Sequence, residues 1–135
     1  MKKEFIKYSG HKDEMLNSAI VMASTVLPKG KTIYLVWTDV KNLRGYSKSL
    51  QYQFLNELSI EKFIKSPLPF PLGNGFITAI SLDKMSVICD GDIVIDCFTG
   101  ELFNNTNISH MIHLPWTQQE SDLLSNKEQE IETST

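Results

Sequence analysis

The chain has 135 residues, of which 41% are apolar and 21% are charged, and its formal net charge at pH 7 is −3. These values are typical of one globular domain, and no apolar run approaches the ~18 residues that a membrane span needs. The lysine-containing N-terminus lacks the apolar core of a secretory signal, so we expect a cytoplasmic protein that contacts no membrane.

Apolar periodicity predicts the elements of the first half of the chain. A short strand is expected within residues 1–10, and a helix over residues 13–27, where apolar residues recur at helical spacing until Pro28. Residues 32–40 are apolar on both alternating faces, which is typical of a central strand covered on both sides. A second helix and a further short helix should follow, carrying Leu50, Phe54 and Leu58, and Ile60, Phe63 and Ile64.

Residues 75–103 dominate the prediction. Asp90-Gly91 lies between two apolar, β-branched runs and is a strong hairpin signal. Weaker turn signals on either side extend the hairpin to a meander of three or four antiparallel strands. In this register Asp92 and Asp96 share a partly solvated face, while the opposite face packs against a helix.

Together these elements predict an α+β fold, with an antiparallel β-meander of four to six strands and two or three helices packed on one face. Residues 1–117 would form a single globular domain, ending in a strand or helical turn over residues 108–114. Residues 118–135 are polar and acidic, so we expect a helical or disordered tail that is dispensable for folding.

Charge is distributed unevenly along the chain. Residues 1–65 contain 11 Lys and Arg against 6 Asp and Glu (+5), residues 66–117 one lysine against five acids (−4), and residues 118–135 again one against five (−4). An acidic surface repels nucleic acid and attracts basic protein surfaces. We therefore expect no nucleic-acid partner. The predicted binding surface for a basic protein partner consists of Asp83, Asp90, Asp92, Asp96 and Glu101. The alternative is a solvated face with acids at its turns.

Candidate catalytic and metal-binding residues are few. Cys97 could act as a nucleophile with His110, but a reactive thiol needs an electropositive setting and acids surround this one. His110 and His113 have a spacing that could bind zinc only with further ligands, and Asp90-Gly91-Asp92 lacks the remaining ligands of a calcium loop. We predict no cofactor and no metal, and expect Cys89 and Cys97 to be reduced, buried thiols.

The segment of residues 91–103, GDIVIDCFTGELF, resembles the sheet hairpin of small bacterial immunity proteins of the SUKH type. In that family a strand running into an aspartate, here Asp96, is followed by a Thr-Gly-Glu turn, here Thr99-Gly100-Glu101, and a return strand. The resemblance implies a non-catalytic protein that blocks a toxin domain by covering its site.

The sequence therefore predicts non-enzymatic protein binding, by an immunity or neutralising protein that covers a basic toxin or effector domain. Two other classes stay open. One is a small enzyme using Cys97 with His110, which rapid thiol alkylation at neutral pH would favour. The other is an accessory subunit that pairs with another chain through a sheet edge.

Overall fold

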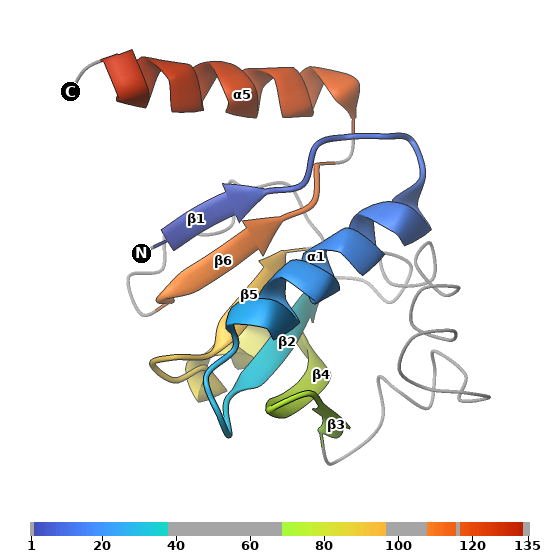
Figure 1. Ribbon diagram of the computed structural model, residues 1–135, viewed down its shortest axis with the longest axis vertical. Helices are drawn as coiled ribbons and strands as arrows, with labels where there is room; N and C mark the ends of the chain where they lie inside the picture. Colours follow the sequence, from blue (N-terminus) through green and yellow to red (C-terminus); the bar gives the residue numbers. More distant parts are fainter. Residues whose placement is uncertain (1, 38–68, 97–107, 116, 134–135) are drawn as a thin grey trace.

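The computed structural model describes residues 2–37, 69–96, 108–115 and 117–133. Within them the chain forms six strands, two α-helices and one 3₁₀ segment (Figure 1). In chain order these are β1 (Lys2–Phe5), α1 (Lys12–Val26), β2 (Thr32–Trp37), β3 (Phe70–Leu72), β4 (Gly75–Ser81), η1 (Leu82–Val87), β5 (Ile93–Asp96), β6 (His110–His113) and α5 (Gln118–Thr133). The two predicted helices between β2 and β3, and the residues Cys97 and Glu101, lie outside the described residues.

The six strands form one mixed sheet in the order β1-β6-β5-β2-β4-β3. Every neighbouring pair is parallel except β3 and β4, which are antiparallel. The chain is α+β overall, but the predicted antiparallel meander is wrong, because this sheet is mostly parallel.

The Asp90-Gly91 turn exists, but it does not close a hairpin. The N–H of Asp92 donates to the carbonyl of Cys89 at 3.1 Å, and Gly91 has a φ of 91°, which glycine adopts without strain. The residues before the turn form η1, and β5 pairs in parallel with β2 and β6. A turn dipeptide reverses the chain, whereas burial decides which strand pairs with which. All four residues of β5 are buried, as in a central parallel strand.

The helix α1 covers one face of the sheet (Figure 1). The helix predicted over residues 13–27 is confirmed as Lys12–Val26. Its apolar side forms the larger core cluster with inward residues of β2, β4 and β5. This cluster includes Met15, Leu16, Ala19, Ile20 and Ala23 from α1, and Ile33, Leu35, Ile77, Ile93 and Ile95 from the strands. Burial of each large side chain contributes roughly 1.5–3 kcal/mol, so this contact is a main source of stability.

The strand β2 is central, as predicted, and apolar on both faces. It lies between β5 and β4. Ile33 and Leu35 belong to the cluster under α1, whereas Val36 belongs to a second cluster on the opposite face. The predicted strand extended to residue 40, and residues 38–40 lie outside the described part of the chain.

The helix α5 lies beyond β1, apart from α1 (Figure 1). It follows β6 after a short link, so its first turn is held near the carboxyl ends of β5 and β6. Neither of the two described helices is long and apolar enough to cross a membrane.

Candidate functional site

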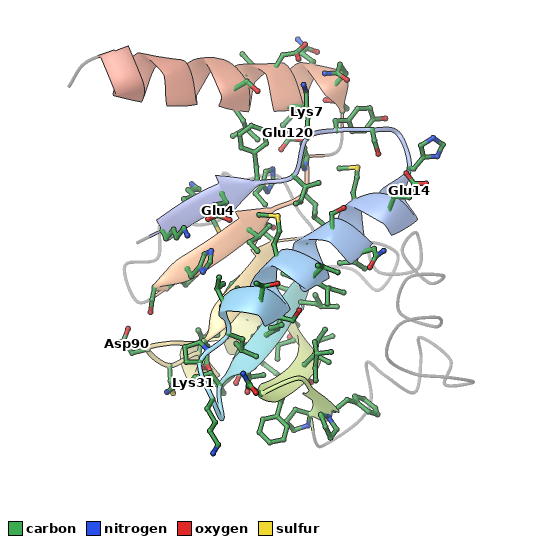
Figure 2. All side chains as sticks on the ribbon, in the orientation of Figure 1. Glu4, Lys7, Glu14, Lys31, Asp90 and Glu120 are labelled. Atoms are coloured by element: carbon green, nitrogen blue, oxygen red, sulfur yellow. The ribbon has the colours of Figure 1, made fainter. Side chains whose placement is uncertain are left out.

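Three charged side chains meet where β5 and β6 end and α5 begins. Asp96 and His113 are direct partners in the register of these two parallel strands. Nδ1 of His113 lies 2.8 Å from Oδ2 of Asp96, and Nε2 lies 2.6 Å from Oε1 of Glu120 in the first turn of α5. We call this trio the His113 clasp. Figure 2 shows Glu120 on the side of α5 that faces the sheet.

The proton count of the clasp follows from its geometry. An ionised carboxylate only accepts hydrogen bonds, and a neutral imidazole has only one N–H to donate. Because both ring nitrogens face carboxylates, the geometry favours the doubly protonated imidazolium when both carboxylates are ionised. Burial lowers the pKa of His113, but the hydrogen bonds and charges of Asp96 and then Glu120 outweigh it, so the pKa lies above its ordinary value of 6.5.

Backbone and side-chain hydrogen bonds hold the clasp in place. The carbonyl of Asp96 accepts from the N–H of Leu114, and the carbonyl of His113 accepts from the N–H of Ile6, both at 2.9 Å. At the start of α5, Thr117 Oγ1 accepts from the N–H of Glu120 at 3.1 Å. This is the first half of a capping box, Thr-Gln-Gln-Glu, which fixes where α5 begins.

A second contact of α5 supports the first. Ser121 is buried, and its Oγ accepts from the N–H of Tyr8 at 3.2 Å. The first turn of α5 is therefore attached both to β6 and to the segment after β1. The clasp and this hydrogen bond together fix α5 at its N-terminal end.

The clasp has the chemistry of a closed ion network rather than of an acid–base catalyst. A general base needs a free lone pair within reach of substrate. In this structure both ring nitrogens of His113 lie within hydrogen-bond distance of carboxylates, and its side chain is almost fully buried. Among the described residues no cluster of three His, Cys, Asp or Glu side chains could hold a metal ion. What the clasp can do is bind the start of α5 to the sheet, with a strength that depends on the proton of His113.

The predicted acidic binding surface is divided by the fold. Asp92 and Asp96 are only 5% and 0% exposed, so the expectation that they share a solvated face is wrong. Asp92 accepts from the N–H of Thr32 and of Cys89, at 3.0 and 2.9 Å, and so ties the start of β5 to β2. Asp83 and Asp90 are exposed, and Glu101 lies outside the described residues.

The thiol and histidine predictions also change. Cys89 is a free, exposed thiol, so its predicted burial is wrong, because η1 and the turn replace the expected strand. Cys97 lies outside the described residues, but Asp96 before it is opposite His113. His110 lies three residues before His113 in β6, roughly 10 Å from it along the strand. The histidine at the carboxyl ends of β5 and β6 is therefore His113.

Sequence signals for the clasp were present but scattered. Asp96 ends a buried apolar run, His113 ends another, and Thr117-Gln118-Gln119-Glu120 is a capping-box sequence. In parallel strands the carboxyl ends meet at one edge, so these signals converge only once the parallel pairing is known. The antiparallel prediction placed Asp96 and His113 without any relation to each other.

The amino edge of the sheet carries a small open depression. Its walls include Val26, Pro28 and Ile93, with Lys2 and His110 at its side. The depression is mostly apolar, and among the described residues its side chains do not form a catalytic group.

Comparisons with known proteins add no further assignment. No family model matches the chain, and neither does any curated protein or any solved structure. The resemblance of residues 91–103 to SUKH-type immunity proteins therefore stays a prediction.

Proposed function

We propose that this chain is a non-enzymatic binding protein of the cytoplasm that neutralises a toxin or effector domain with a basic surface, and that α5 is its acidic binding element. The observation that carries the proposal is the attachment of α5. An acidic helix is fixed to the sheet at one end by the His113 clasp.

The charge of α5 suits a basic partner. The helix contains five acids and one lysine, a balance of −4, over 16 residues or about 24 Å of length. Asp122, two residues after Glu120, is exposed. A concentrated acidic surface speeds the capture of a basic partner and makes the rate depend on salt.

The proposal moves the binding surface from the meander to α5. Asp90 and Glu120 lie at opposite ends of the sheet (Figure 2). The resemblance of residues 91–103 to immunity proteins supports the same class of function.

The experiment compares the wild type with a variant in which acidic residues of α5 are neutralised. The partner is recovered by pull-down from the native host, purified, and its association rate is measured over a salt series. Replacing Asp122 by Asn and Glu128, Glu130 and Glu132 by Gln leaves Glu120 and the clasp intact. We expect association at low salt to slow by about tenfold, with a weaker salt dependence.

The matched control neutralises the same kind of charge elsewhere. Asp83→Asn with Asp90→Asn should leave the association rate within about twofold of the wild type, since exposed charges beyond a Debye length are screened. If the α5 variant associates at the wild-type rate at every salt concentration, α5 is not the binding element.

The sheet edge offers less support for the accessory-subunit alternative. The edge strand β3 is three residues long and contains Pro71, which has no N–H to donate. The other edge, β1, carries Lys2 and Lys3. Short length, proline and lysine are features that protect edges from pairing with another chain.

The enzyme alternative has one observation in its favour. The chain leaves β2 toward β4 on one side and leaves β5 toward β6 on the other, so the ends of β2 and β5 form a topological switch point. Ligands bind at such points in open α/β sheets, and Asp96 lies there. Catalysis by His113 would require its Nε2 to be free of Glu120. A chain ending at Gln119 lacks Glu120 and would test this.

A further inference from the structure

The outward side of α1 is unusual for a surface helix. From residue 15 to residue 27 the sequence contains no Asp, Glu, Lys or Arg. The exposed residues within that stretch form what we call the α1 strip: Ser18, Val21, Met22, Thr25 and Val26. Val21 and Val26 are 53% and 52% exposed. Solvent-facing helix surfaces normally carry charge, so a neutral, partly apolar strip marks a surface suited to contact.

Two hydroxyl groups in this part of α1, that of Thr25 within the strip and that of Ser24 beside it, already donate hydrogen bonds. Thr25 Oγ1 donates to the carbonyl of Val21 at 2.8 Å, and Ser24 Oγ donates to the same carbonyl at 3.0 Å. Covering the strip would therefore leave neither of these donors without a partner, and burial of an unsatisfied donor is the main cost of covering a polar surface.

The charges at the two ends of the strip are opposite in sign. Glu14 is exposed at the N-terminal end of α1, and Lys29 is exposed just beyond the C-terminal end. Figure 2 shows Glu14 at the N-terminal end of α1 and Lys31 beyond its C-terminal end, two residues after Lys29. Glu14 is seven residues before Val21, and Lys29 is seven residues after Met22. The charges are therefore equidistant along the sequence from the middle of the strip.

We propose that α1 is the interface of a homodimer, in which the α1 helices of two copies pack antiparallel across a two-fold axis between Val21 and Met22. The axis buries Val21, Met22 and Val26 of both copies and sets Glu14 of each opposite Lys29 of the other. A second copy presents the same neutral strip with the same charges in reverse order, as an isologous interface requires. The antiparallel helix dipoles are also favourable.

The first test measures mass in solution. Sedimentation velocity from about 1 to about 100 µM should show a concentration-dependent approach to twice the chain mass of 15.4 kDa. Val21→Glu enters the interface twice and should raise the dimer dissociation constant at least about tenfold. Val87→Glu is the control, because Val87 is equally exposed at 53% but lies in η1. It should leave the mass distribution unchanged.

The second test addresses the antiparallel register. Glu14→Lys and Lys29→Glu should each weaken the dimer at low salt, because each places like charges opposite one another. The double variant exchanges the two charges and should recover most of the lost affinity. Circular dichroism confirms that each variant is folded.

Three results would overturn the proposal. They are a wild-type protein that stays monomeric over the whole range, a Val21→Glu variant that dimerises like the wild type, and a double charge variant no tighter than both single variants. This proposal does not depend on the binding function of α5, because the variants that test the two lie on different helices.

Discussion

Asp96 and His113 are direct partners at the ends of two parallel strands, and their side chains approach to 2.8 Å between Oδ2 and Nδ1. The aspartate is completely buried. A carboxylate at that depth is stable only with hydrogen bonds and a compensating charge. His113 supplies both, and it keeps its second proton because Glu120 accepts at the other nitrogen.

Replacing His113 by Leu should therefore destabilise the fold strongly. The change removes the cation whose Nδ1 lies 2.8 Å from Oδ2 of the buried Asp96. Loss of one partner of a buried ion pair typically costs about 3–5 kcal/mol. Urea denaturation monitored by tryptophan fluorescence measures the change in unfolding free energy.

The control for this variant is His110→Leu. Among the described residues Nε2 of His110 has no hydrogen-bond partner and only a long contact, 3.8 Å, with Oε2 of Glu4, so its loss should cost no more than about 1 kcal/mol. Adding Asp96→Asn to His113→Leu should recover part of the lost stability, because the buried charge is then absent. Additive losses in the double variant would show that the two side chains are not coupled.

Stability should fall as the pH rises above neutral. Burial lowers the pKa of His113, and the carboxylates of Asp96 and Glu120 raise it to a net value above 6.5. A group with a raised pKa in the folded state contributes its full stability below the unfolded pKa, and loses it as the pH passes the folded value. The decline should therefore begin near pH 6.5 and continue up to the raised pKa.

The measurement is the urea midpoint between about pH 6 and pH 9. This window begins just below the ordinary pKa of histidine and extends well above it. The His113→Leu variant provides the reference, because it lacks the titrating group. The wild-type midpoint should decrease relative to that variant over the window. A constant difference between the two proteins would mean that His113 does not titrate there.

Local elements were predictable from the sequence, whereas strand pairing was not. The α1 helix and the β2 strand follow from the periodicity of their own residues. The partners of β5 depend on burial by β2 and β6, which are distant in sequence. The Asp90-Gly91 signal concerns only the four residues of a turn, and that turn is present in the structure.

The same limit explains the acidic surface. Asp92 looks like a solvated residue after a turn, but its carboxylate accepts two backbone N–H groups at the start of β5. An aspartate that satisfies buried backbone donors has the same local sequence as one at a surface turn. Only the tertiary structure distinguishes the two.

Cys89 should react quickly with a thiol reagent in the native protein. It is exposed, and its Sγ donates to the carbonyl of Val87 at 3.5 Å. An accessible thiol reacts without unfolding, whereas a buried one waits for an opening event. Titration with an aromatic disulfide reagent should show one fast equivalent, and Cys89→Ser should abolish that phase. A fast phase that survives in Cys89→Ser would place the reactive thiol elsewhere.

The last prediction concerns the tail, which the sequence suggested to be dispensable. A chain ending at Gln119 loses Glu120 and Ser121, and with them the acceptors for His113 Nε2 and for the N–H of Tyr8. Its thermal midpoint should fall by at least about 5 °C, roughly 1 kcal/mol for a domain of this size. A chain ending at Ser125 keeps both contacts, and its midpoint should fall by less than about 2 °C.

The full-length Glu120→Gln variant separates the two contacts. Glutamine can still accept from His113 Nε2 but carries no charge, so it should cause part of the loss seen in the chain ending at Gln119. The hydrogen bond from Tyr8 to Ser121 accounts for the remainder. If both truncated chains melt at the wild-type temperature, the first turn of α5 does not stabilise the domain, and the His113 clasp binds the helix without contributing to the fold.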